Sequence, residues 1–477
     1  MPTELTWEPP GPGAWFWDAG HASKPTSRAI QELLPDAMRE GFQVFTADYG
    51  LPLSHIAIRY VNEYGYSSPQ LANLGEREVP PPGAAEQAFA TKRWREELRS
   101  WNEELRPALV EARLELQRVD LAALSDADLA THVETAADEF ARGMRTHFAL
   151  VGATAIPVGD FLAHCREWGL PNEECLALLV GEHPLTRACR EATSEDELAE
   201  AIGYWMIGRY DVTGRTMREE PSAMEAARRA EPPSAPSPVL LRDKVPLDEQ
   251  AAFDELLDEA RRGFSARDDH ATIGGLWSMG IIRHSLIEAG RRLGLGDDVF
   301  LLSCTEVAEA LRGARPDLDA LVQQRVAWAA LVSDATPPPM LGEGGGPPPF
   351  ELPGALGRVM AAMFAYMDGM NGTGRAIGIG TGIVRGRAVV AIDPEAAIDR
   401  IEPGDILVTT TTTPAFGAVF PILGGVVASS GGPLSHTAIV ARELGLPAVV
   451  GVADALVRIA DGSTIELDAS TGEVRVV

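Results

Sequence analysis

The 477-residue sequence is poor in basic residues and in cysteine. It holds 41 Lys and Arg against 69 Asp and Glu, which gives a formal net charge of −28. A chain without a basic surface cannot neutralise a phosphate backbone, so we expect no nucleic-acid partner. The four cysteines show neither Cys-x-x-Cys spacing nor a regular framework. Such thiols are typical of reduced residues in a cytoplasmic protein, where we expect this chain to work.

Other common signals are also missing. No apolar run approaches the ~20 residues of a membrane span, and the first residues lack a basic region followed by an apolar core, so we expect neither export nor membrane contact. His, Cys and acidic residues show no metal-ligand spacing, which predicts no metal site. No Gly-rich phosphate loop is visible, because Gly344–Gly346 lies among prolines and is interpreted as linker. We therefore expect no bound cofactor.

Length and local patterns predict a multidomain α+β protein. A chain of 477 residues with 45% hydrophobic side chains is too long for one core. We expect an N-terminal segment with a small β element in 1–80, a mainly helical domain in 81–336, a Pro/Gly-rich linker and connecting segment in 337–374, and a C-terminal domain in 375–477. The period-two alternation of residues 55–61 predicts a strand in the first of these.

Helical periodicity dominates the second predicted domain. We expect helices over 85–119, 126–150, 158–168, 172–180 and 194–210. The Pro- and Ser-rich stretch 231–238 is typical of a loop, either a lid or a disordered insertion.

The most informative stretch is 424–451, near the C-terminus. An apolar run that ends at Ala428 predicts a buried strand, and the pair Gly431-Gly432 predicts a tight turn. A helix capped by Ser435 should follow and end before Pro447, ahead of a second apolar strand. His436 would then lie in the first turn of that helix.

This position has chemical consequences for His436. Free backbone N–H groups and the helix dipole favour negative charge at a helix start and disfavour an imidazolium. We therefore expect a neutral and exposed imidazole. Such a side chain can attack phosphorus and hold the phosphoryl group, or it can act as a general base. A capping role without chemistry is the simpler alternative.

The same stretch resembles the swivelling, phosphohistidine-carrying domain of the phosphoenolpyruvate-utilising enzymes. The match runs from Gly431 to Gly451, and the segments 380–388, 403–408, Thr413-Pro414 and 461–474 follow the family pattern as well. The resemblance implies a C-terminal β/β/α His domain that swings as a rigid body, with His436 on the phosphorylated position. It also implies supporting roles in the His loop for Gly431, Gly432, Ser435, Thr437 and Arg442.

Parts of the helical region are similar to the substrate domains of rifampin-phosphotransferase-like proteins. The similarity lies in Trp15–Lys24, in Leu178–Leu185 and in the block from Arg267 to Glu306. Asp268 and His270 in this block are candidate catalytic acids that would assist His436, although a buried cluster of Arg, Asp and His is equally typical of a structural network. The implied substrate-binding residues are Arg267, Arg283, Arg209, Arg215 and Glu219. We also expect Arg283 to share a cavity with Asp268 or His270. The stretch 208–221 lacks a histidine that the family pattern has there, which weakens a direct transfer of the family's chemistry.

Residues 80–334 show neither ATP-grasp nor (β/α)8-barrel signals, so we expect no phosphoryl-donor site in this chain. One hypothesis is ATP-independent acid–base dehydration of a hydroxylated, natural-product type small molecule, extended by Michael-type cyclisation. The alternative is the acceptor-side subunit of a phosphotransferase, whose phospho-His436 is charged by a separate ATP-grasp protein. A non-catalytic phosphohistidine carrier is a third reading, which leaves the helical domain without a purpose.

Overall fold

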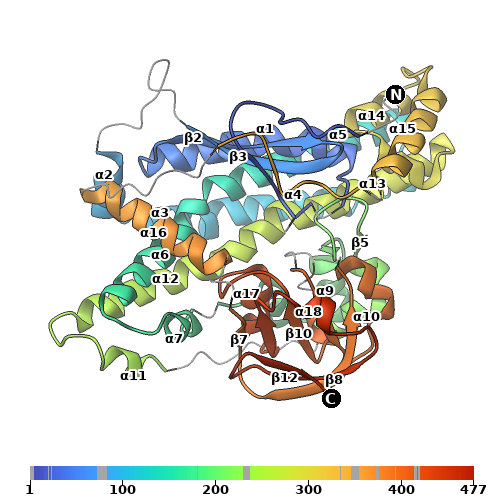
Figure 1. Cartoon of the computed structure of the whole chain (residues 1–477). Coiled ribbons are helices and arrows are strands. Elements are labelled where there is room, and N and C mark those ends of the chain that lie inside the picture. Colours follow the sequence, from blue (N-terminus) through green and yellow to red (C-terminus); the bar gives the residue numbers. More distant parts are fainter. Residues whose placement is uncertain are drawn as a thin grey trace.

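The structure is a computed structural model of the chain, and it describes residues 5–19, 21–22, 24–71, 83–179, 181–228, 237–333, 335–344, 354–371, 375–392, 394–412, 416 and 419–477. Figure 1 shows a helical body with a small sheet and, below it, a C-terminal sheet domain. The predicted multidomain α+β class is confirmed. The predicted Thr413-Pro414 element and most of the loop 231–238 lie outside the described residues.

The helical body is built from sixteen α-helices in the described residues. They are α1 (Arg28–Asp48), α2 (Ala84–Thr91), α3 (Arg93–Ser100), α4 (Arg106–Gln117), α5 (Asp126–Ala149), α6 (Val151–Glu167), α7 (Asn172–Ala177), α8 (Pro184–Glu191), α9 (Glu195–Ile202), α10 (Pro221–Ala227), α11 (Val239–Arg242), α12 (Gln250–Ala271), α13 (Trp277–Leu293), α14 (Cys304–Leu311), α15 (Leu318–Val332) and α16 (Gly354–Asn371). The helix expected over 194–210 is wrong in its second half. There β4 (Met206–Ile207) pairs with β5 (Arg215–Thr216), since Gly208 turns the chain with a φ of +74° that other residues rarely adopt.

The stretch 126–167, which contains α5 and α6, is long and apolar enough by composition to cross a membrane. Within the fold, however, 72% of its most apolar window is buried. Packing inside the helical body therefore accounts for its apolar character.

A small antiparallel sheet closes one side of the helical body. Its strands are β2 (Leu53–Val61), β3 (Tyr64–Leu71), β1 (Trp15–Trp17) and β6 (Met340–Leu341), in that order. The strand predicted over 55–61 is confirmed by β2. Because β6 follows α15 in the chain, this sheet joins the N-terminal segment to the end of the helical region. The Tyr64 hydroxyl strengthens the link by donating to the carbonyl of Val332 at 3.1 Å.

The C-terminal domain is a seven-stranded sheet in the order β13-β12-β8-β9-β10-β11-β7. Its elements are β7 (Ile377–Ile379), β8 (Ile383–Val390), β9 (Ile406–Thr409), β10 (Gly425–Ala428), α17 (His436–Glu443), β11 (Ala448–Val450), α18 (Ala455–Arg458), β12 (Thr464–Asp468) and β13 (Glu473–Val476). The strands β8, β9, β10 and β11 run parallel to their neighbours in this series. The strand, helix and strand predicted over 424–451 are confirmed as β10, α17 and β11. Both strands are fully buried, which explains their continuous apolar sequences.

One apolar core is shared between the two domains. Leu434, which precedes α17, and Ile439, which lies in α17, are 0% and 1% exposed. Both pack in one cluster with Phe161 of α6 and Phe253 of α12. Leu434 also lies against Gly369 of α16, where a Cβ would approach its side chain to 2.6 Å. The C-terminal domain is thus docked on the helical body by buried apolar side chains.

A π-helical turn, Thr272–Leu276, joins α12 to α13. A π turn breaks the regular hydrogen-bond ladder and leaves carbonyl groups in need of donors. Arg113 of α4, which is 0% exposed, donates to the carbonyl of Ile273 at 3.0 Å and pairs with Glu139 at 2.9 Å. On the other side Gly143 approaches the turn so closely that a Cβ would lie 2.2 Å from the Gly274 carbonyl. These contacts fix the C-terminal end of α12.

We expect Arg113→Met to lower the free energy of unfolding by about 1–3 kcal/mol, because it leaves the buried carbonyls of the π turn without their donor, while the partly exposed Glu139 keeps its pair with Arg142. Urea unfolding followed by tryptophan fluorescence measures this change. Arg118→Met is the matched control, since the exposed Arg118 at the end of the same helix pairs only on the surface with Glu200. Equal stability of the two variants would show that the π turn does not depend on Arg113.

We expect Leu434→Ala to loosen the docked domain, since truncating a fully buried leucine costs about 2–5 kcal/mol and this one packs in the shared core. Hydrogen exchange should rise in peptides covering α17 and the end of α16 while the β8 to β10 sheet stays protected. Val457→Ala is the control, because Val457 is 92% exposed on the same domain. Exchange that rises throughout the sheet would indicate unfolding of the domain instead.

Candidate active site

The His loop is shaped by short-range contacts before α17. Gly431 has a φ of +96°, and a Cβ there would lie 2.8 Å from the Ser435 Cβ, so the turn requires glycine. The Ser435 hydroxyl accepts the Ala438 N–H and caps the helix, with His436 as its first residue. Thr437, also in the first turn, shares a 2.9 Å hydroxyl hydrogen bond with Thr412 after β9. His436 is therefore held on a rigid helix start.

The docked domain covers this loop. The N–H groups of Gly432 and Leu434 donate to the carbonyls of Met370 and Gly369 at 2.8 and 2.7 Å, at the end of α16. The His436 side chain is only 14% exposed as a result. The expectation of an exposed imidazole is wrong for this docked arrangement. The sequence of the loop alone does not predict which distant residues pack over it.

Arg267 of α12 is the main polar contact of His436. One of its guanidinium nitrogens lies 3.1 Å from Nδ1 and 2.9 Å from Nε2 of the imidazole, and the other donates to the Leu434 carbonyl at 3.3 Å. A guanidinium only donates hydrogen bonds, so it favours a neutral imidazole with an accepting nitrogen. Burial lowers the pKa of His436 well below its usual range, and the Arg267 charge adds to that effect.

A second histidine faces His436 from the N-terminal segment. The ring of His21 lies 5.7 Å from that of His436, edge to face. The carboxylate of Asp18 is 2.9 Å from His21 Nδ1 and raises the pKa of His21. His21 is 45% exposed, so this side of the site opens to solvent. The sequence analysis did not select His21, although its segment belongs to the stretch that resembles a substrate domain.

The predicted pocket residue Arg209 and the nearby Asp211 support the His21 segment. Arg209 donates to the carbonyl of Pro25, and Asp211, which is 2% exposed, accepts the N–H of Ser27 at 2.8 Å. Between them, the Tyr210 ring lies 5.9 Å from His21. The stretch 208–221 therefore acts on the site by holding residues 25–27, through backbone contacts that need no histidine at this place.

Arg283 and Glu219 form an ion pair of their own, and Arg215 makes different contacts. Arg283 pairs with Glu219 at 2.9 Å and donates to the Val212 carbonyl, so the expected cavity with Asp268 or His270 is wrong. The reason is distance, because 15 residues of nearly continuous helix between 268 and 283 span about 22 Å. Arg215 reaches the C-terminal domain and pairs there with Asp399 at 2.7 Å, which makes it a docking contact.

The structure separates the two predicted acid partners of His436. Asp268 is 4% exposed, and its Oδ1 lies 3.8 Å from His436 Nδ1. His270 instead shares a 2.7 Å hydrogen bond with His147, and its ring edge packs on Trp101. Burial lowers the pKa of His270 well below its usual range and that of His147 to about 3, so both rings are neutral. A neutral imidazole has no imidazolium proton to give, which disfavours the acid role predicted for His270.

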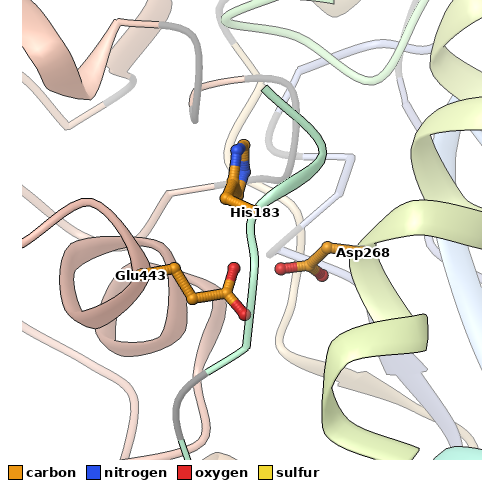
Figure 2. Close-up of side chains that lie close together, drawn as sticks. All are labelled: His183, Asp268 and Glu443. Atoms are coloured by element: carbon orange, nitrogen blue, oxygen red, sulfur yellow. The ribbon is translucent and has the colours of Figure 1, made fainter. Parts of the chain in front are cut away.

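A group of possible metal ligands lies beside Asp268. Ligand atoms of His183, Asp268 and Glu443 all lie within 4.8 Å of one another. Figure 2 shows the two carboxylates pointing toward each other from α12 and α17, with the His183 segment running between these helices. The sequence analysis predicted no metal site, because spacing rules detect ligands that are close in sequence and these are 85 and 175 residues apart.

The comparisons with known proteins agree with this architecture. Residues 401–472 match the model of the family described as PEP-utilising enzyme, mobile domain. The rifampicin phosphotransferase of Streptomyces sviceus is 37% identical over 181 residues, 38% of this chain and 19% of that protein. A second rifampicin phosphotransferase, from a Streptomyces species, is 30% identical over 308 residues, 58% of this chain and 34% of its own length.

A phosphoenolpyruvate synthase of Aeropyrum pernix is 41% identical over 100 residues, 21% of this chain and 12% of that protein. The chain thus spans about a third or less of each of these curated relatives. The family match covers β9, β10, α17 and β11, the elements that carry and frame His436. Residues 401–472 are therefore similar to the mobile domain of the phosphoenolpyruvate-utilising enzymes, and the matches to rifampicin phosphotransferases extend beyond that segment.

Proposed function

We propose that this chain eliminates water from a β-hydroxy carbonyl compound by acid–base catalysis between its two domains. The carrying observation is the facing pair of His436 and His21, whose environments favour opposite protonation states beside the Arg267 guanidinium. Burial and Arg267 keep His436 neutral, whereas Asp18 favours the imidazolium of His21. Two titratable groups whose pKa values are shifted in opposite directions are suited to the roles of base and acid.

In this reaction His436 takes the proton from the carbon next to the carbonyl. The electron pair of that C–H bond forms the carbon–carbon double bond as the bond to the β-hydroxyl breaks. The His21 imidazolium gives its proton to the leaving oxygen, so that water departs. Arg267 stabilises the negative charge that develops on the carbonyl oxygen. Exchange with solvent on the exposed side of His21 restores both starting protonation states.

The substrate class follows from this chemistry. Removal of a carbon-bound proton by a neutral imidazole requires the acidity that a neighbouring carbonyl provides. A second hydroxyl of the same molecule can then add to the conjugated double bond and close a ring, with the proton transfers running in the reverse sense. A polyhydroxylated natural-product type molecule meets both requirements.

Phosphoryl transfer is the second candidate. It is supported by the position of His436 at a helix start, by the Arg267 contact with both ring nitrogens, and by relatives that are named phosphotransferases. In this version a separate ATP-grasp protein charges His436, which then phosphorylates a hydroxyl bound by the helical body. The carboxylate of Asp268, 3.8 Å from Nδ1, opposes a phosphoryl group at this place.

We expect His436→Asn to lower dehydration at least ~10³-fold, because the variant keeps a polar side chain of similar size and removes the base. Mass spectrometry of a panel of β-hydroxyacyl thioesters, scored for loss of one water, measures the rate. His55→Asn is the matched control, since His55 lies on β2 and bonds to Ser54. Full activity in a folded His436→Asn variant would exclude both candidate functions.

A second prediction separates the two functions. Dehydration requires no phosphohistidine, so intact-protein mass spectrometry under alkaline conditions should show no phosphoryl adduct with ATP, with phosphoenolpyruvate or in cell extract. An adduct present in the wild type and missing in His436→Asn would replace dehydration by phosphoryl transfer. His21→Asn adds a further check, because loss of the acid should slow elimination about 10²–10⁴-fold and leave phosphorylation of His436 intact.

A further inference from the structure

The carboxylates of Asp268 and Glu443 face each other in the interface between the domains, together with His183 (Figure 2). Each residue comes from a different element. Asp268 lies in the last turn of α12, His183 directly precedes α8, and Glu443 ends α17 of the mobile domain. The cluster therefore exists in full only when the mobile domain is docked.

These side chains are deeply buried, and three of the four carboxylate oxygens lack a hydrogen-bond partner among the described residues. Their exposed fractions are 6% for His183, 4% for Asp268 and 2% for Glu443. Among the described residues, neither oxygen of Asp268 nor Oε2 of Glu443 has a hydrogen-bond partner. Two facing carboxylates in such a place are strongly unfavourable unless a proton or a cation lies between them.

The surrounding arginines are engaged elsewhere. Arg267 bonds to His436 and the Leu434 carbonyl, and its Nε lies 3.9 Å from Asp268 Oδ1. Arg187 pairs with Asp269 at 3.2 Å, and Arg442 donates to the carbonyl of Pro433 through Nη2, while its buried Nη1 has no hydrogen-bond partner among the described residues. These arginines therefore leave both oxygens of Asp268 and Oε2 of Glu443 without a hydrogen bond.

One imidazole and two carboxylates form a mixed nitrogen and oxygen ligand set. Such sets are typical of divalent transition metals, and three protein ligands leave room for a water molecule or a substrate oxygen. Bonds of about 2.0–2.2 Å place two ligand atoms at most about 4.4 Å apart. The present separations, within 4.8 Å, need only small side-chain rotations to reach that range.

We propose that His183, Asp268 and Glu443 bind one divalent metal ion of the Mn²⁺ or Zn²⁺ class, and that this ion fastens the docked mobile domain to the helical body. Metal binding would replace one local hydrogen bond, because without the metal His183 Nδ1 accepts the Leu185 N–H. To coordinate through Nε2, the imidazole must move its proton to Nδ1, and this hydrogen bond is then lost. The inference rests on the geometry of the interface and holds for either candidate function.

The first test is metal content and affinity. The full-length protein is purified without chelator and analysed by inductively coupled plasma mass spectrometry, then stripped with EDTA and titrated with MnCl₂ and with ZnCl₂ by calorimetry. We expect one ion per chain and saturable binding at a ratio of one. Absence of metal in the purified protein together with no saturable binding of either ion would overturn the proposal, and would assign a shared proton to the two carboxylates.

The second test uses variants and domain docking. Glu443→Gln keeps the size of the side chain and should weaken binding at least tenfold, as should Asp268→Asn, while Glu402→Gln on the exposed surface of the same domain should bind as wild type does. Metal removal from the wild type should raise hydrogen exchange in peptides covering α17. Equal affinity in Glu443→Gln and wild type, or exchange that is unchanged by EDTA, would contradict an interdomain metal clasp.

Discussion

The contact between Arg267 and the His loop is the interaction on which the candidate site depends. Arg267 belongs to α12 of the helical body, and its guanidinium binds both the Leu434 carbonyl and the imidazole of His436. His436 itself belongs to the mobile domain. In the proposed dehydration, neither domain alone would contain a complete set of catalytic groups, since the base would come from one and Arg267 and His21 from the other. Docking of the two domains would then be part of that mechanism.

Apolar and polar contacts have different parts in docking. Leu434 and Ile439 contribute burial, which is strong and nearly insensitive to orientation. The hydrogen bonds of Gly432 and Leu434 to the end of α16, and the pair of Arg215 with Asp399, are directional and fix how the domain sits. The π turn and Arg113 also contribute, because they fix the C-terminal end of α12, which carries the residues that contact the His loop. Together these contacts define one docked geometry of the C-terminal domain.

The sequence predicts the mobile domain far better than the site. The apolar runs, Gly431-Gly432 and the Ser435 cap predict β10, α17 and β11, because local rules govern these elements. The partners of His436 obey no local rule. His21, His183 and Glu443 approach Arg267 and Asp268 only through tertiary packing, so their spacing in the chain carries no signal. Because such packing is not visible in the sequence, His436 was expected to be exposed. Arg283 was expected beside Asp268 or His270, although nearly continuous helix separates it from them.

The net charge around His436 determines whether this interface can hold a phosphohistidine, and a bound metal ion would change that charge. Asp268 already brings a carboxylate to 3.8 Å from His436 Nδ1, and the Glu443 carboxylate lies beside that of Asp268. A phosphoryl group on His436 would add about two more negative charges to the same buried volume. A divalent cation between the carboxylates offsets that charge and makes a phosphohistidine tolerable there. Without such a cation, the Arg267 guanidinium beside His436 is left to offset the charge of a phosphoryl group. The occupancy of the His183, Asp268 and Glu443 cluster therefore bears directly on which of the two chemistries the docked domain can perform.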